Sequence, residues 1–237
     1  MNKKLTEHII RSYYNDNKQQ LDFYIPLVQN KIRTLKEANV IAGTLSKTSK
    51  MPCRSYGITA KACQVGSAMK DLNKQKLNIT CKHDIEVALI DGKLIPTCAL
   101  CYCDDRGNYN YPSVHHALHK RLESITNPLW TEALTYMINN ELKKGYDYFR
   151  WHDSGDIQSL DHLEHIIVAC ICTPLIRHWL PTLEAGSHVS QFVQKYGSID
   201  KISNLCVRAS TPFINARPMP NKNNGIQASV VIADDRT

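Results

Sequence analysis

The densest concentration of reactive side chains is segment 150–159, Arg-Trp-His-Asp-Ser-Gly-Asp-Ile-Gln-Ser. Asp153 and Asp156 are three residues apart and lie beside His152 and Arg150. Two carboxylates in different surroundings can divide the roles of nucleophile, acid and base. The alternative is an ordinary turn that caps the next helix, with a histidine there by chance. Because polar groups are so concentrated here, we predict a catalytic site formed by Asp153, Asp156 and His152.

A second group of reactive side chains consists of cysteines. Cys98, Cys101 and Cys103 combine the spacings C-x-x-C and C-x-C, and Cys63 precedes them. A C-x-x-C turn lets two thiolates face one ion, and structural zinc takes four such ligands. An iron–sulfur cluster is the competing occupant, because cysteine thiolates hold it too. With buried free thiols as the alternative, we predict a zinc site, or else an iron–sulfur cluster, at Cys63, Cys98, Cys101 and Cys103.

The positive charge of the chain is concentrated in its first third. The 237 residues carry a formal net charge of +7. Residues 1–83 contain 15 Lys and Arg against 5 Asp and Glu, whereas residues 84–237 are slightly acidic. This pattern is typical of a protein that binds a polyanion, although it also fits a solvated lysine-rich surface. A polyanion is therefore the expected partner, and the charge pattern alone leaves DNA and RNA open.

The composition excludes several classes of protein. Hydrophobic residues make up 43% and charged residues 22%, which is ordinary for a globular protein. No apolar run approaches the roughly 18–20 residues that a membrane span requires. The first twenty residues lack the apolar core of a signal peptide. We therefore expect a cytoplasmic protein with no membrane partner, whose nine cysteines stay mostly reduced. Cys170, Cys172 and Cys206 lie in apolar segments and are expected to be core residues.

Predicted helices and strands alternate through the second half of the chain. The helices are expected at 114–125, 130–144, 160–172 and 187–196, and the strands at 146–151, 175–180, 204–208 and 229–232. This alternation indicates an α/β fold with a largely parallel sheet, as a TIM-barrel-like fold, a partial or irregular barrel, or an open sheet. In each case the site lies beyond the C-terminal ends of the strands, which is where Asp153 falls.

The first half of the chain is less regular. A helical pattern covers 25–40, a loop-like stretch covers 43–82, and two apolar runs at 85–95 flank Asp91-Gly92, which predicts a hairpin with a type I′ turn. The expected organisation is a basic helical N-terminal region, a cysteine-rich metal-binding region and an α/β catalytic region, the last two forming one compact unit. These regions are 1–50, 51–112 and 113–237.

Several segments resemble the phage "gene 88 protein" family, and together they span roughly residues 50–210. The long segment 149–159 is the most specific of them. The resemblance implies a phage protein that works in the cytoplasm of its host cell. The shorter segments are Lys50-Met51-Pro52, Ala60-Lys61-Ala62-Cys63, the Cys98–Cys101 pair with Tyr102, Trp179-Leu180-Pro181-Thr182 and Asn204-Leu205-Cys206-Val207-Arg208.

Residues 153–158, Asp-Ser-Gly-Asp-Ile-Gln, also resemble the Asp-Ser-Gly-Gly-Phe-Gln motif of queuine tRNA-ribosyltransferases. A Leu-Pro-Thr segment at 180–182 resembles one that follows in the same superfamily. Those TIM-barrel enzymes carry a structural zinc and exchange guanine for a 7-deazaguanine base, and phage relatives do so on DNA. The resemblance implies a DNA-modifying glycosyltransferase that uses a free 7-deazaguanine base, and it raises a homodimer as an option. Two features depart from the pattern: Asp156 replaces a glycine, and Arg177 occupies the position expected for the nucleophile.

Base exchange implies further roles near Asp153. The target base must leave the stack, so an aromatic pocket floor is expected from Trp151, Tyr102 or Trp179. Arginines at strand ends can contact phosphates, or can instead pair with Asp147 or Glu184. The residues expected to bind substrate are Ser154, Gly155, Gln158, Trp151, Arg150 and Arg208.

Two other functions fit the same residues. One is an iron–sulfur, radical-type enzyme acting on nucleic acid or nucleotides, in which Cys63, Cys98 and Cys101 hold the cluster and the aspartates bind substrate. The other is a non-enzymatic nucleic-acid-binding phage protein with a structural zinc.

Overall fold

The computed structural model describes residues 1–48, 51–103, 107–218 and 225–232. A sheet of five parallel strands forms its centre, and the order of the strands in space follows their order in the chain. The strands are β1 (Arg54–Tyr56), β2 (Tyr148–Trp151), β3 (Arg177–Thr182), β4 (Leu205–Ser210) and β5 (Gln227–Ser229).

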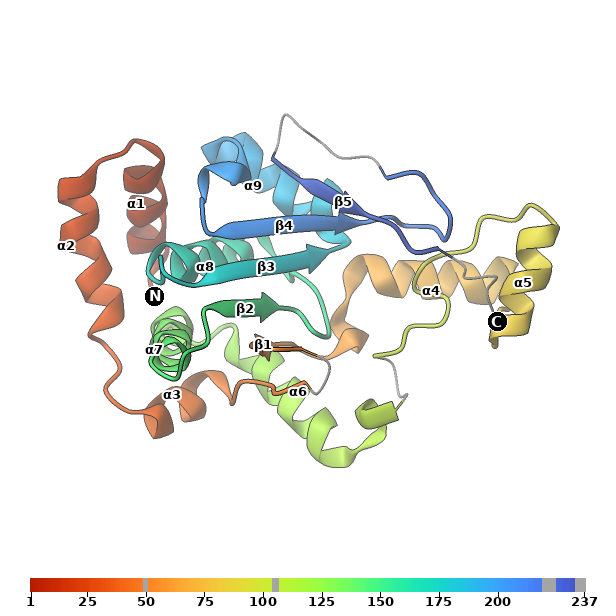
Figure 1. The fold of residues 1–237 in the computed structure, drawn as a ribbon, viewed down its shortest axis with the longest axis horizontal. Coiled ribbons are helices and arrows are strands. Elements are labelled where there is room, and N and C mark those ends of the chain that lie inside the picture. Colours follow the sequence, from red (N-terminus) through yellow and green to blue (C-terminus); the bar gives the residue numbers. More distant parts are fainter. Residues whose placement is uncertain (49–50, 104–106, 219–224, 233–237) are drawn as a thin grey trace.

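The helices enclose one side and both ends of this sheet (Figure 1). The longer ones are α1 (Lys3–Tyr14), α2 (Lys18–Gln29), α3 (Leu35–Ala42), α4 (Gln64–Lys76), α5 (Lys82–Ile90), α6 (Pro112–Ser124), α7 (Trp130–Leu142), α8 (Leu160–Ile171) and α9 (His188–Tyr196). Short 3-10 helices are η1 (Ala60–Ala62), η2 (Gly107–Asn110), η3 (Glu184–Gly186) and η4 (Ile199–Lys201).

Helix α7 packs on α8, and α8 packs on α9 and α1, so these helices form one layer. Right-handed crossovers between neighbouring parallel strands place successive helices on the same face of the sheet, which explains the layer. The predicted α/β class with a parallel sheet is thus confirmed. The five described strands form an open sheet, so they do not complete a TIM barrel.

The two faces of the sheet differ in how they are covered. Side chains alternate along each strand. Phe149, Leu180 and Val207 are buried under the helix layer, on what we call the covered face. Tyr148 and Trp179 are 47% and 38% exposed on the opposite side. The strand registers place Ser55, Pro181, Ser210 and Ser229 on this opposite side, together with seven larger side chains. We call these seven the open face: Tyr148, Arg150, Arg177, Trp179, Cys206, Arg208 and Gln227.

Local capping explains where several helices begin. Asn2 accepts a hydrogen bond from Leu5 N at the start of α1, and Ser159 accepts one from His162 N at the start of α8. Each side chain satisfies a backbone donor that the first turn leaves free. The main hydrophobic core runs from Met1 to Ile226, so the N-terminal helices and the sheet share it.

A small second core lies in the cysteine-rich region, and it contradicts the predicted hairpin at 85–95. Ile79, Ala88 and Ile95 are its buried members. The Asp84 carboxylate accepts hydrogen bonds from Thr80 N and Cys81 N, at 2.7 and 3.0 Å, which starts the helix α5. The apolar runs therefore belong to a capped helix and the chain after it, and a propensity-based prediction missed this.

Other predicted boundaries also need correction. The helical pattern at 25–40 is split, because α2 ends at Gln29 and α3 begins after the capping residue Thr34. Helix α4 lies inside the stretch predicted as loop. The last strand is β5, which meets the predicted 229–232 only at Ser229. Across the described residues, every helix is too short or too polar to cross a membrane.

Candidate functional site

A pocket with a volume of about 660 Å³ opens beyond the C-terminal end of β2. This is the edge of the sheet at which parallel α/β folds place their sites. The volume lies in the range of pockets that enclose a small molecule. The side chains that matter for its chemistry are Lys47, Tyr102, Tyr109, Arg121, Arg150 and Asp153.

Asp153 is the only acidic residue among those lining this pocket within the described part of the chain. Its Oδ1 atom is buried without a geometric hydrogen bond from the described residues, and the neighbouring Ser55 side chain favours the charged carboxylate. Gly57 leaves room for the carboxylate, because a methyl group there would collide with Oδ1 and would lie 2.8 Å from Ser154 N. Burial raises the pKa of Asp153, and the charges of Arg121 and Arg150 oppose that shift. The carboxylate is thus buried at the pocket wall, close enough to two arginines for their charges to act on it.

Two arginines flank the carboxylate. Arg121 Nη1 donates to Gly57 O at 2.9 Å, while the Nε atoms of Arg121 and Arg150 are buried without a partner among the described residues. The guanidinium of Arg150 lies 4.6 Å from the ring centroid of Trp179, so this side chain links the pocket to the open face. Buried donors and acceptors without partners are costly, which favours a polar ligand here.

Asp156 has a different role from Asp153. Thr182 Oγ1 and Ile157 N donate to its Oδ1 at 2.6 and 2.8 Å, and Leu183 N donates to its Oδ2 at 2.8 Å. Burial raises the pKa of Asp156 to about 6, although these hydrogen bonds act to lower it. The carboxylate therefore fastens the turn after β2 to the end of β3. The predicted pairing of Asp153 and Asp156 in one pocket does not occur.

Two of the predicted metal-binding cysteines, Cys63 and Cys98, come close together from distant segments. A methyl group on Gly66 would lie 3.5 Å from Cys98 Sγ and 3.9 Å from Cys63 Sγ. Burial, Asp156, Cys101 and Cys98 together raise the pKa of Cys63 to about 12. Even so, no three His, Cys, Asp or Glu side chains in the described ranges converge on a point that one metal ion could occupy.

Cys103 lies next to Cys101 and also at the edge of the Asp153 pocket. Its Sγ atom donates to Asp153 O at 3.7 Å, and it lines the Asp153 pocket. A side-chain hydrogen bond with Cys101 and burial both raise its pKa. Cys103 therefore sits between the other thiols and the pocket.

A family model matches most of the chain. The model is described as "Gene product 88", and it covers residues 15–237. The chain belongs to the Gene product 88 family. No curated protein and no solved structure is similar enough to count as a match.

In this Gene product 88 protein, Trp151, which was predicted to bind substrate, and His152, which was predicted to be catalytic, do not line the pocket. Trp151 is fully buried on the covered face, where its Nε1 donates to His178 Nδ1, so it cannot form the floor for a base. His152 is 3% exposed with a φ of 53°, and neither ring nitrogen has a partner in the described structure. Burial lowers the pKa of His152 to about 3, so the ring stays neutral.

The other motif residues build the turn. Ser154 is 3% exposed, and the Gln158 side chain donates to Asp156 O at 2.7 Å. Gly155 has a φ of 79° and lies against Ile58, so it needs to be glycine. The specific motif therefore encodes a turn that presents Asp153.

Arg150 and Arg208 were expected at neighbouring strand ends. They lie on β2 and β4, which β3 separates, and both project from the open face. Arg208 Nη2 donates to Gln227 Oε1 at 3.1 Å rather than pairing with Glu184. Cys206 also lies on the open face, whereas Cys170 and Cys172 are fully buried as predicted.

Sequence reasoning missed two pocket residues, Arg121 and Tyr109. Arg121 is 5% exposed on α6, one turn after the buried Leu118. An arginine on the apolar side of a helix is a signal that could have been used, since buried charges require a reason. Tyr109 contacts Asp153 through its hydroxyl, 3.3 Å from Asp153 O, and its sequence gives no such signal.

Proposed function

We propose that this Gene product 88 protein binds a single strand of nucleic acid across the open face and acts on one base in the Asp153 pocket. The reaction that we propose is exchange of guanine for a 7-deazaguanine base in DNA. The observation that carries the proposal is a partly exposed sheet face, rich in arginine, that continues into a pocket lined by one buried carboxylate.

The open face is unusual for a parallel sheet, since such sheets are normally covered on both faces. Arg150, Arg177 and Arg208 lie on it, and its seven residues include no aspartate or glutamate. Tyr148 and Trp179 present rings beside the arginines. Positive charge interleaved with aromatic rings is the surface that single-stranded nucleic acids bind, through phosphate contacts and base stacking.

The pocket suits one nucleotide that has left the stack. It is continuous with the open face through Arg150, and Tyr102 and Tyr109 form an edge-to-face pair with centroids 5.8 Å apart at its wall. An enzyme that acts on a base takes that base out of the stack into such a pocket.

The exchange can be written with the residues of this pocket. The Asp153 carboxylate attacks C1′ of the sugar as the bond from C1′ to guanine breaks, which gives a covalent sugar ester. Because Asp156 is engaged elsewhere, we assign the proton for the departing guanine to the Tyr109 hydroxyl. The incoming 7-deazaguanine then attacks C1′, returns a proton to Tyr109 and releases the carboxylate.

The test is release of labelled guanine from an oligonucleotide in the presence of excess 7-deazaguanine base. We expect exchange by the wild-type chain and its loss in Asp153→Asn, which keeps the size of the side chain but not the nucleophile. Asp161→Asn is the matched control, because Asp161 is an exposed residue paired with Lys3. Tight oligonucleotide binding without exchange would contradict the enzymatic proposal and leave a nucleic-acid-binding protein. Exchange that persists in Asp153→Asn would contradict the role of the carboxylate.

A further inference from the structure

We infer that the Asp153 pocket encloses a phosphate group of its nucleotide as well as the base, and that Arg121 and Lys47 recognise that phosphate. The inference deepens the proposed function, and it rests on that function in taking the ligand to be a nucleotide. Three features of the pocket carry it: an excess of positive charge, the burial of Arg121, and the length of the pocket along α6.

Positive side chains outnumber negative ones in the lining of the pocket. Lys47, Arg121 and Arg150 line it, and Asp153 is the one acidic side chain there among the described residues. A charge that is enclosed away from water is unfavourable unless an opposite charge lies close to it. A neutral purine base cannot balance the excess of positive charge, whereas a phosphate group can. The lining therefore favours an anionic ligand.

Arg121 is the cation that most needs a negative neighbour, because only 5% of it is exposed. Its Nη1 atom donates to Gly57 O at 2.9 Å, and its guanidinium lies 5.7 Å from the centroid of the Tyr56 ring. Both contacts hold the side chain in place, but neither brings a negative charge to it. Asp153 is close enough for its charge to raise the pKa of Arg121, which burial lowers. One carboxylate is thus shared between Arg121 and Arg150.

The pocket extends along one side of α6. Five residues of this helix line it, at positions that recur every three to five residues: Ser113, Val114, Ala117, Leu118 and Arg121. From Ser113 to Arg121 the helix rises by roughly 12 Å, at about 1.5 Å for each residue. A purine base alone would fill only part of this length. The pocket therefore has room for a base, its sugar and a phosphate group.

The start of α6 adds hydrogen-bond donors to the pocket. Tyr111 precedes the helix and gives it no side-chain cap, and Ser113 lies in the first turn. The N–H groups of a first turn carry a partial positive charge that favours a phosphate group. Thr48 also lines the pocket, and its Oγ1 atom is buried without a hydrogen-bond partner among the described residues. A phosphate oxygen can accept a hydrogen bond from such a hydroxyl group.

The experiment compares the affinity of the full-length chain for guanosine 5′-monophosphate and for guanosine, by isothermal titration calorimetry at low salt. We expect the monophosphate to bind about tenfold or more tightly, because hydrogen bonds to a charged group are strong in an enclosed site. Its advantage should shrink as the salt concentration rises. Equal affinity for the two ligands, or no binding of either at millimolar concentration, would overturn the inference.

A competition measurement separates the two sources of the phosphate. A single-stranded oligonucleotide should displace the bound monophosphate, because the proposed function places a nucleotide of the strand in the pocket. A monophosphate that stays bound at saturating oligonucleotide would support the phosphate site, assign it to a free nucleotide, and contradict the proposed binding of a strand there. The two proposals also fail separately in the exchange assay. Preference for the monophosphate without guanine exchange contradicts the exchange alone, and exchange with equal affinity for both ligands contradicts this inference alone.

Variants test which residues recognise the phosphate. Lys47 is exposed, so Lys47→Gln should fold normally and reduce the advantage of the monophosphate by about two- to fivefold. Arg121→Gln should remove most of the advantage, and Arg121→Lys should restore part of it because the positive charge returns. Circular dichroism of the same samples separates loss of binding from loss of the fold. An unchanged advantage in both Lys47→Gln and Arg121→Gln would overturn the inference.

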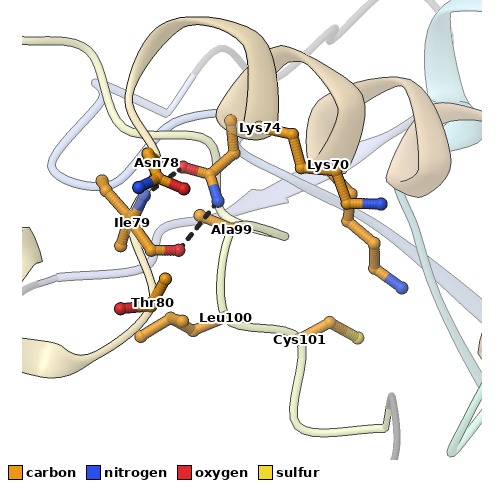
Figure 2. A pocket seen from close by; sticks show the side chains of 9 residues that line it. Lys70, Lys74, Asn78, Ile79, Thr80, Ala99, Leu100 and Cys101 are labelled. Atoms are coloured by element: carbon orange, nitrogen blue, oxygen red, sulfur yellow. Dashed lines mark hydrogen bonds between the residues drawn. The ribbon is translucent and has the colours of Figure 1, made fainter.

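The matched control is Lys74→Gln, which removes a positive charge from another hollow. Lys74 lies on α4 and lines a hollow of about 360 Å³ between this helix and residues 99–101 (Figure 2). Among the described residues, none lines both this hollow and the Asp153 pocket. We expect Lys74→Gln to keep the full advantage of the monophosphate. An equal loss in Lys74→Gln and Lys47→Gln would show that the preference reflects the overall charge of the protein, and it would overturn the inference.

Discussion

The same strands present apolar side chains on one face of the sheet and arginines and aromatic rings on the other. Leu180 on the covered face is fully buried, while its neighbour Trp179 on the open face is 38% exposed. Both residues lie in β3, so the difference comes only from the alternation of side chains. Burial of the side chains on the covered face stabilises the fold. The charges on the open face contribute little to that stability.

The comparison explains where function can reside. A helix layer buries the side chains of the covered face, so substitutions there should change the stability of the fold. The open face leaves Tyr148 and Trp179 partly exposed in the described structure, and its Arg150 leads to the only carboxylate that lines the pocket among the described residues. Substitutions there should act on binding and leave folding nearly unchanged.

The largest expected effect on the covered face is that of Leu180→Ala. It removes a fully buried side chain, so the free energy of unfolding should fall by about 3 kcal/mol. Urea unfolding at pH 7 measures the change. Trp179→Ala is the comparison, and it should cost no more than about 1 kcal/mol, the stacking with Arg150. Equal losses in the two variants would contradict the division between the faces.

The covered face should also make stability depend on pH. Burial lowers the pKa of His178 to about 3, so the folded protein keeps this ring neutral while the unfolded chain takes up a proton below about pH 6.5. Stability is therefore full above pH 6.5 and falls as the pH is lowered, by roughly 2 kcal/mol at pH 5 for this one histidine. Urea unfolding at both pH values measures it. His178→Gln should reduce the dependence, and an unchanged slope would show that His178 does not titrate in this way.

Trp179→Ala should weaken binding of a single-stranded oligonucleotide by about 1–3 kcal/mol, because a base loses its stacking partner. Fluorescence anisotropy at fixed salt gives the affinity. Leu175→Ala is the control, since Leu175 is 73% exposed and lies outside the open face. An equal effect of both variants would mean that the strand does not lie on the open face.

The smallest effect concerns the arginines. Arg177→Gln should lower the slope of log affinity against log salt by about 0.7, the contribution of one single-strand phosphate contact. Titrations at several salt concentrations give the slope. Arg33→Gln, between α2 and α3, should leave it unchanged. If both variants change the slope equally, the salt dependence reflects the charge of the whole surface and not a phosphate contact made by Arg177.

Local sequence patterns predicted much of the architecture. The strands β2, β3 and β4 and the helices α6 to α9 lie close to their predicted ranges, because apolar periodicity and the end signals at Gly145 and Ser159 are local. Helix α5 was not predicted, because the interactions that define it are not local in the sequence. Its apolar residues show no clear periodicity, and they are organised by contacts with Ile79 and Ile95, outside the helix.

The sequence by itself determined that a polar turn follows an aromatic strand, that thiols are concentrated ahead of it, and that strands and helices alternate, since each of these depends on neighbouring residues. Only the tertiary structure decided that Asp153 faces the pocket while Asp156 fastens the turn to β3. The register between β2 and β3 sets that division, and three residues of separation cannot reveal it. Likewise, the hydrogen bond from Tyr109 to Asp153, the effect of the Arg121 charge on Asp153 and the approach of Cys98 to Cys63 near Gly66 all involve distant segments. Packing of the whole chain creates these neighbourhoods.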